Sequence, residues 1–214
     1  MPSSSMWSHA SRFEWLAALI GAWFWALSAG VWAGAQVEAP LSDSVRSALR
    51  AAVGAAAPPE PVFVDAAHRA RFERWMRELN PRLAVWVDSA QGRQDLLQTV
   101  WYEAQRAGLP PERVMGLIQV ESAFRKHAIS VADARGLMQV MPFWARLIGQ
   151  GDVAALFQLQ VNLRFGCTIL RHYLGIEGGD WFMALGRYNG SRGQSRYPRA
   201  VLAASRQWAL SATP

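Results

Sequence analysis

Residues 110–124 read PPERVMGLIQVESAF, and they determine how the rest of the chain is interpreted. Proline suits the first turn of a helix, and Glu112 suits the positive end of the helix dipole, so a helix is predicted to begin here and to run through Phe124. One face of this helix, at the spacing i, i+3, i+4, i+7, consists of Val114, Leu117, Ile118 and Glu121. Glu121 therefore stands where an apolar core residue is expected, and burial should raise its pKa.

A buried carboxyl at this position has a clear chemical use. General-acid cleavage of a glycosidic bond needs a carboxylic acid that stays protonated near neutral pH. The alternative is a glutamate at a helix end that reaches water or pairs with Arg125, four residues later. This helix taken alone leaves both interpretations open.

Further motifs restrict the choice. Residues 130–142 read SVADARGLMQVMP, and residues 185–190 read LGRYNG. Together with GLIQVESAF, they resemble the soluble lytic transglycosylase family of cell-wall enzymes, which has a lysozyme-like fold. The matching motifs occur in the family's order, namely Glu121-Ser122, Ser130, 136–142 and Tyr188-Asn189, with Tyr197 fitting the closing motif. The resemblance covers roughly residues 96–205, and four ordered motifs are a specific signal.

The resemblance implies a reaction. Glu121 would be the only catalytic acid and base. It would protonate the oxygen of the MurNAc–GlcNAc β-1,4 link in peptidoglycan strands, then take a proton from the C6 hydroxyl of the same MurNAc. The product would be a 1,6-anhydro ring, formed without water, a metal or a cofactor. This differs from the usual glycosidase scheme with two carboxylates.

The resemblance also implies the rest of the site. The substrate-binding residues would be Ser130, Gln139, Met141, Tyr188 and Tyr197. Ser130 would hold the N-acetyl group, and Tyr188 would hydrogen-bond Glu121. Ser122 and Asn189 would support the site, although Ser122 could equally only close the end of its helix through its hydroxyl.

The sequence departs from the family pattern at two places. Asp133 stands where the family commonly has glycine, and RYNGS at 187–191 stands where AYNAG is common. A second carboxylate at Asp133 could activate water, as in the goose-type lysozymes of related fold, and would make the protein a hydrolase. A loop-surface aspartate beside Arg135 is the interpretation we favour. A non-catalytic wall-binding scaffold is the further alternative.

The rest of the chain predicts a mainly α fold, a single lysozyme-like helical domain behind an N-terminal export or anchor segment. Helical periods recur at 72–79, 97–104, 163–174 and 197–208, and a short helix is expected near 41–53. Asn80-Pro81 and Gly175 are predicted to end two of these helices, Gly108 to cap another, and Pro142 to begin one. Cys167 lies on an apolar stripe and is expected in the core.

The amino-terminal residues point to export. Residues 15–35 carry no charge and end in Ala-Gly-Ala, which is typical of a secretory signal, but the run is also long enough to anchor the chain in the inner membrane. The predicted organisation is 1–35 signal or anchor, 36–61 linker, 62–95 helical accessory segment and 96–210 transglycosylase domain. The predicted location is periplasmic, either soluble or tethered.

The amino-acid composition and the distribution of charge exclude several kinds of site and partner. The single cysteine excludes an internal disulfide framework and a CxxC redox motif, and no His spacing suggests a metal site. All of the net charge of +6 comes from residues 96–214, since residues 36–95 carry as many acidic as basic groups. That bias suits an anionic polymer such as peptidoglycan. Nucleic acid is not expected as a partner, because it conflicts with export and no binding motif is present.

Overall fold

The computed structural model describes residues 36, 38–54 and 62–211, all within the unit of chain Val31–Pro214. The predicted signal or anchor segment, residues 1–35, and the linker residues 55–61 lie outside these described residues. Within the described part of the chain, no helix is both long and apolar enough to cross a bilayer.

The regular structure of the described residues is helical. The elements are α2 (Asp43–Gly54), α3 (Ala66–Leu83), α4 (Ala90–Ala107), α5 (Pro111–Ser122), α6 (Pro142–Ile148), the 3-10 helix η1 (Ala154–Phe157), α7 (Leu159–Ile176), α8 (Trp181–Asn189) and α9 (Arg196–Gln207). Only isolated β-bridges, Ile129 to Arg135 and Arg135 to Val140, occur between these helices in the part described. The mainly α prediction is confirmed.

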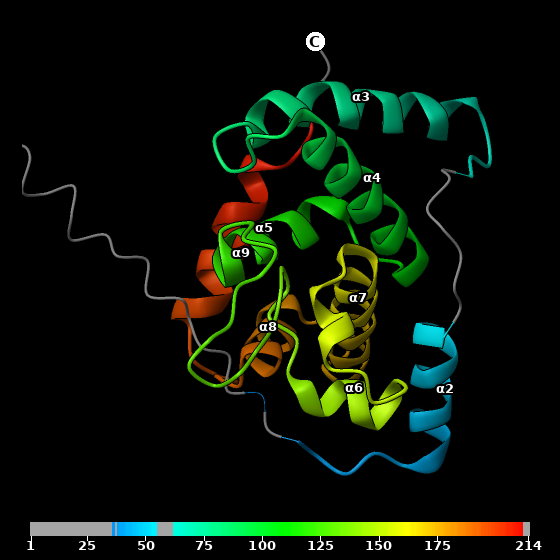
Figure 1. The fold of residues 1–214 in the computed structure, drawn as a ribbon, viewed down its shortest axis with the longest axis vertical. Helices are drawn as coiled ribbons and strands as arrows, with labels where there is room; N and C mark the ends of the chain where they lie inside the picture. The colour runs from blue at the N-terminus through cyan, green and yellow to red at the C-terminus, as the bar shows by residue number, and fades with distance from the viewer. Residues whose placement is uncertain (1–35, 37, 55–61, 212–214) are drawn as a thin grey trace, which may run out of the picture. The chain divides into compact units, whose positions relative to one another are not determined.

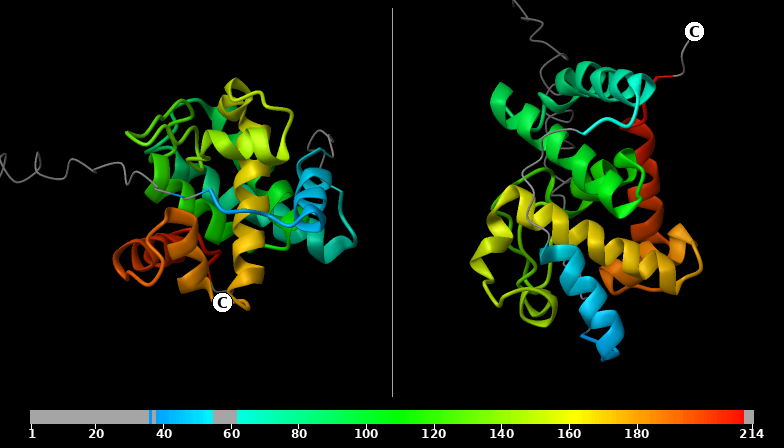
Figure 2. Two further views of the ribbon diagram at one scale, coloured as in Figure 1. Left: turned by 90° about the horizontal axis from the view of Figure 1, so that it is seen from below. Right: turned by 90° about the vertical axis from the view of Figure 1, so that its right-hand side faces the viewer.

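Helix α7 is the element around which the others are arranged. It packs against α2, α4 and α8, while α5 packs against α9. In Figures 1 and 2, α3 and α4 lie on one side of α7, and α2 and α6 lie on the other. The loop of residues 123–141, which carries the second motif, connects α5 to α6 across this arrangement.

Local sequence signals set most of the helix ends. Asp65, Ser89 and Asp180 accept hydrogen bonds from the first-turn amides of α3, α4 and α8. Gly108 closes α4 with φ of 65°, and Pro142 occupies the first turn of α6, both as the sequence predicts. These residues fix where α3, α4, α6 and α8 begin and where α4 ends.

Three predicted helix ends are wrong by a few residues. Helix α3 continues through Pro81 to Leu83, because losing one backbone donor is offset by the full burial of Leu79 and Leu83. Helix α5 stops at Ser122, two residues before Phe124. Helix α7 passes Gly175 and ends at Ile176.

A glycine lets α5 and α9 approach closely. A Cβ added at Gly116 would lie 2.4 Å from Ser205 Oγ and 2.6 Å from the Ser205 backbone nitrogen. Only a residue without a side chain fits there. The close contact brings the first turn of α9, and with it Tyr197, beside the last turn of α5.

The core fills the space between the helices with apolar side chains, and Cys167 is fully buried among them as predicted. It also contains one ion cluster. Glu103 on α4 is fully buried and pairs with Arg106 at 2.8 Å and with Arg164 of α7 at 3.0 Å. Arg106 also donates to the carbonyl of Ala52 on α2. The charges are therefore paired where burial would otherwise be costly.

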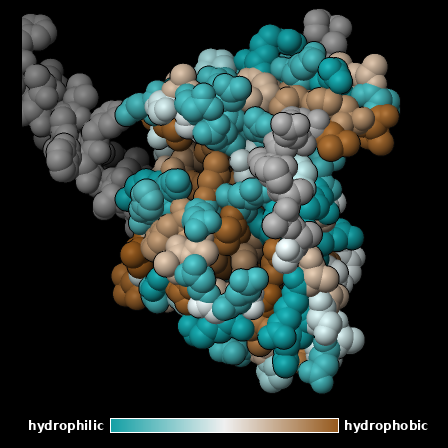
Figure 3. Space-filling view, turned by 45° about the vertical axis from the view of Figure 1, so that its right-hand side comes forward, coloured by the Kyte–Doolittle hydropathy of each residue, from teal (hydrophilic) through white to brown (hydrophobic). Residues whose placement is uncertain are grey.

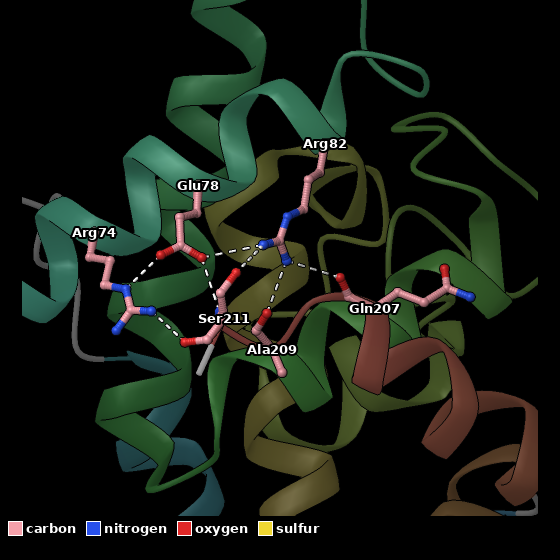
Figure 4. A network of polar contacts seen from close by, with 6 residues as sticks. All are labelled: Arg74, Glu78, Arg82, Gln207, Ala209 and Ser211. Atoms are coloured by element: carbon pink, nitrogen blue, oxygen red, sulfur yellow. Dashed lines mark hydrogen bonds and ion pairs between the residues drawn. The ribbon is translucent and has the colours of Figure 1, made fainter. Parts of the chain in front are cut away.

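The accessory segment is tied to the carboxyl end of the described chain. Figure 4 shows the side chains of Arg74, Glu78 and Arg82 on α3 directed toward Gln207, Ala209 and Ser211. Glu78 Oε2 accepts from the Ser211 backbone amide at 3.0 Å, and Arg82 donates to the Ala209 carbonyl at 2.9 Å. The backbone bond to Ser211 and the neighbouring Arg74 hold the pKa of Glu78 at about 2.

Large apolar side chains exposed to solvent are scattered over the described surface. They are Val62, Val64, Val85, Trp86, Ile129, Val131 and Ile176. The space-filling view shows the same pattern on one face, where hydrophobic patches alternate with hydrophilic surface (Figure 3). Single exposed apolar residues of this kind are usual on soluble domains.

Candidate active site

Glu121 lies in the last turn of α5 with only 1% of its surface exposed. Its Oε1 accepts a hydrogen bond from the hydroxyl of Tyr197, and its Oε2 is buried with no hydrogen-bond partner among the described residues. Burial raises the pKa of Glu121 to about 8, although the bond from Tyr197 opposes the rise. The raised pKa expected from the helix face is confirmed, and Glu121 is protonated at neutral pH.

The two tyrosines of the motifs have different partners. Tyr197 on α9 donates to Glu121, whereas Tyr188 on α8 donates to the carbonyl of Met138 at 2.8 Å. The prediction that Tyr188 hydrogen-bonds Glu121 is therefore wrong, since its single hydroxyl hydrogen is used elsewhere. Burial raises the pKa of the Tyr188 phenol, and the Glu121 charge raises it further. Tyr188 therefore still lies close to Glu121.

The loop after α5 is built on left-handed backbone. Ala123, Phe124, Asp133 and Gln139 all have positive φ between 48° and 65°, and Gly136 has φ of 75°. Positive φ is costly for residues with a side chain, and it clusters at functional sites. At Gly136, a Cβ would also lie 2.3 Å from Asn162 Nδ2, which explains why glycine is required there.

Asn162 on α7 holds this loop, and the sequence motifs did not identify it. Its Oδ1 accepts from the Met138 amide at 2.8 Å, and its Nδ2 donates to the carbonyls of Arg135 and Leu156 at 2.8 and 2.7 Å. A single buried amide thus satisfies two backbone groups of the loop 123–141 and one of η1. A lone asparagine on an apolar helix carries no spacing signal by which it could have been found.

Ser130 and Gln139 lie within this loop, and both are buried. Ser130 Oγ accepts from the amides of Ala132 and Ala134 at 3.2 and 3.0 Å, so its own hydrogen is directed elsewhere. Gln139 Nε2 donates to the carbonyls of Ala128 and Gly136, while its Oε1 has no partner in the described part of the chain.

Three motif residues have a buried polar atom without a partner among the described residues. These atoms are Glu121 Oε2, Gln139 Oε1 and Asn189 Nδ2. Tyr188 relates the three, since it precedes Asn189 in the chain, bonds to the residue before Gln139, and interacts with the Glu121 charge. A buried polar group left unpaired is costly, and each such atom in a native fold is a candidate for contact with a ligand.

Ion pairs hold the Tyr-Asn motif in place. Arg187, the residue before Tyr188, takes part in them. Glu177 Oε1 pairs with Arg187 at 2.6 Å and with Arg192 at 2.8 Å. Both guanidinium groups, with Arg192 first, keep the pKa of Glu177 at about 2. The cluster ties the loop after α8 to the end of α7, and Asn189 Oδ1 accepts from Ser191 within that loop.

The remaining predicted residues have mainly structural contacts. Ser122 Oγ donates to the Ile118 carbonyl, which closes the helix end. Met141 is half-buried and packs on the core. Asp133 lies in the loop with its side chain 55% exposed, paired with Arg135 at 3.1 Å. No pairing of Arg125 with Glu121 is present, and Arg125 instead donates to the Ser122 carbonyl.

The chemistry that these residues support is proton transfer by one buried carboxyl. Glu121 holds a proton at neutral pH, and its Oε2 makes no hydrogen bond within the described residues. Within the described residues, no group of three or more His, Cys, Asp or Glu side chains could hold a metal ion.

Comparison with known proteins places these motifs in one domain. Residues 98–207, just over half of the chain, match the family described as the transglycosylase SLT domain. Glu121, the loop 123–141 and the two tyrosines all fall within the matched residues.

Curated relatives match over shorter stretches. Membrane-bound lytic murein transglycosylase C of Actinobacillus pleuropneumoniae is 40% identical over 75 residues, which cover 31% of this chain and 20% of that protein. The protein of the same name from Haemophilus influenzae is 50% identical over 42 residues, which cover 20% of this chain and 12% of that one. The chain thus matches at most about a fifth of the length of these relatives.

Proposed function

Because the chain belongs to the transglycosylase SLT domain family, we propose that it is a lytic transglycosylase that cleaves peptidoglycan strands at the MurNAc–GlcNAc β-1,4 link. The observation that carries this proposal is the burial of Glu121, which raises its pKa to about 8. A carboxyl with that pKa is protonated at neutral pH and can donate its proton to the glycosidic oxygen. The names of the relatives, lytic murein transglycosylases, support the same reaction.

The two oxygens of Glu121 suggest different roles. Oε1 accepts from Tyr197, so the transferable proton is assigned to Oε2, which has no partner among the described residues. After Oε2 protonates the leaving oxygen, the bond from Tyr197 stabilises the carboxylate. The same carboxylate then takes the proton of the C6 hydroxyl as that oxygen closes the 1,6-anhydro ring, which returns Glu121 to its protonated form.

Neighbouring groups are suited to hold the sugar. Ser130 accepts two amide hydrogens, so its hydroxyl hydrogen is available for the N-acetyl carbonyl. Gln139 Oε1 offers an acceptor and Asn189 Nδ2 offers a donor, and both are buried without partners in the described chain. Met141 would supply an apolar wall. In this assignment Tyr197 positions Glu121, and Tyr188 fixes the backbone before Gln139.

We place the reaction outside the cytoplasm. The support is the uncharged run at residues 15–35, typical of an export signal or anchor, and the relatives whose names say "membrane-bound". Fractionation of cells that express the full chain tests this. Recovery from the periplasm or the inner membrane is expected, and recovery from the cytoplasm alone would contradict it.

Digestion of purified cell wall tests the reaction. The protein should release muropeptides that end in 1,6-anhydroMurNAc, detected by their mass, and Glu121→Gln should abolish the release. Products with reducing ends would indicate a hydrolase instead, and Asp133→Gly would then show whether Asp133 is responsible. Binding to the wall without release of fragments, unchanged in Glu121→Gln, would favour a non-catalytic scaffold.

A further inference from the structure

A hollow open to solvent follows directly after the helix of Glu121. Its volume is about 430 Å³, and it is lined by Arg125, Lys126, His127, Ala128 and Ile129. None of these residues is among those that the family motifs assign to the sugar. The hollow is therefore a separate feature of the surface that needs its own explanation.

The hollow has uncompensated positive charge. Arg125 and Lys126 are exposed, and within the described part of the chain neither has an acidic group within 4 Å. Arg135, on the same loop, differs in this respect because it pairs with Asp133 at 3.1 Å. The electrostatic field at this hollow thus favours an anion.

The hollow is linked by hydrogen bonds to residues that we propose to act on the sugar. Arg125 Nε donates to the carbonyl of Ser122, the residue next to Glu121, at 3.0 Å. On the other side, the Ala128 carbonyl accepts from Gln139 Nε2 at 3.2 Å and from the Gly136 amide at 2.9 Å. One short backbone segment therefore joins the acid, the hollow and Gln139.

The hollow is not uniformly polar. Ile129 is 58% exposed at its margin, and the ring of His127 lies 6.0 Å from that of Phe157. A ligand with both carboxylates and short alkyl groups fits such a lining better than a small inorganic anion does.

We propose that this hollow binds the carboxylates of the peptide stems carried by the glycan strand, with Arg125 and Lys126 as the binding residues. The inference rests on the proposed function, because the strand must lie at Glu121 for its stems to reach the hollow. Its consequence is a preference for glycan strands that still carry peptides over bare strands.

The test compares two substrates with the full chain. One is peptidoglycan with intact stems, and the other is the same glycan from which an amidase has removed the stems. The double variant Arg125→Gln/Lys126→Gln should slow release of anhydro products from the first substrate about tenfold, the scale of one charge-assisted hydrogen bond, and leave the second unchanged.

Two further variants control for charge and for local structure. Arg171→Gln/Arg199→Gln removes the same two charges from exposed positions on α7 and α9 outside the hollow, and it should leave both rates unchanged. Arg125→Lys/Lys126→Arg keeps both charges but changes the contact to the Ser122 carbonyl. It should retain most of the activity on strands with stems.

The outcomes separate this inference from the proposed function. If the Arg125→Gln/Lys126→Gln variant slows both substrates equally or neither, the hollow does not bind stems. If the wild-type protein cuts neither substrate, the proposed function is wrong, and cosedimentation of the same variants with the two wall preparations then decides the hollow. Weaker binding to stem-bearing wall alone would support it, and equal binding would overturn it.

Discussion

At the scale of single residues, burial and one hydrogen bond have opposite effects on the pKa of Glu121. Burial favours the neutral carboxyl, and the bond from Tyr197 favours the carboxylate, with burial prevailing at a pKa of about 8. Tyr188 lies close by, but its hydroxyl donates to the Met138 carbonyl. The two tyrosines can therefore be separated by experiment.

Tyr197→Phe removes the donor that stabilises the Glu121 carboxylate. The pKa of Glu121 should rise further, so the fall in activity at alkaline pH should move to higher pH. Activity at the optimum should drop by about tenfold or more, since a hydrogen bond to a charged group is lost. A profile of the rate of anhydro-product release against pH measures both effects.

Tyr188→Phe is the matched control. It breaks a bond between neutral groups and should cost roughly 1 kcal/mol of folding free energy. The alkaline limb should stay where it is in the wild-type protein. Equal shifts of the limb in both variants would contradict the assignment of Tyr197 as the partner of Glu121.

Glu121 should also make the stability of the protein depend on pH. Between 4.5 and about 8 the unfolded chain releases this proton while the folded protein keeps it, so the free energy of unfolding falls as pH rises. Glu121→Gln removes this pH-dependent loss of stability. Its free energy of unfolding at pH 7 should exceed that of the wild-type protein by up to roughly 3 kcal/mol, less any cost of burying the amide. Urea unfolding at pH 4, 7 and 8.5 measures it. At pH 4 this difference in the free energy of unfolding should vanish. The same difference at all three pH values would contradict the link between the Glu121 proton and stability.

At the scale of elements, the contact between α5 and α9 places Tyr197 on Glu121. The sequence predicted both helices from their apolar periods, and it predicted the raised pKa of Glu121 from its place on a buried face. It could not predict which tyrosine bonds to Glu121, because that depends on how closely two helices far apart in the chain approach at Gly116. Asn162 was missed for a similar reason, since two of its three bonds are to backbone groups more than 20 residues away in the chain.

Gly116→Ala tests this contact. The added methyl would meet Ser205, including its backbone, so the helices must separate, at a cost of about 1–3 kcal/mol in folding free energy. Activity should fall as well, because Tyr197 would move from Glu121. Thermal unfolding and the rate assay measure the two effects.

Gly175→Ala provides the comparison. Gly175 lies in α7 with no atom within 4 Å of an added Cβ, so alanine should be neutral or slightly stabilising there. If both alanine variants behave alike, close packing at Gly116 is not what joins the two helices.

At the scale of the whole described unit, the segment 62–95 is joined to the domain in two ways. Helix α3 packs against α4, and the side chains in Figure 4 bind the end of the described chain. Helix α3 lies outside the residues that match the family, yet Glu78 binds the backbone of Ser211 beyond α9. The sequence predicted a helical accessory segment but not its attachment, because the partners are backbone groups that carry no sequence signal.

Glu78→Gln should loosen this attachment. The pKa of Glu78 is lowered from 4.5 to about 2, so its contribution to stability is present above pH 4.5 and is lost as pH falls toward 2. The variant should melt a few degrees lower than the wild-type protein at pH 7, and the difference should shrink near pH 2. Glu73→Gln, at an exposed position on the same helix, should leave the melting temperature unchanged both at pH 7 and near pH 2. A constant difference at every pH would mean that the carboxylate is not responsible.

The neutral state of Glu121 also bears on inhibitor design. A sugar mimic with a positively charged ring nitrogen is attracted to a carboxylate, but at pH 7 it would first have to expel the proton from Glu121. Its affinity should therefore climb as the solution is made alkaline, up to the pKa of the carboxyl, with a proton released on binding below that point. An uncharged mimic whose oxygen accepts a hydrogen bond from Oε2 would not have to displace this proton, and it is the better starting chemistry for an inhibitor aimed at Glu121.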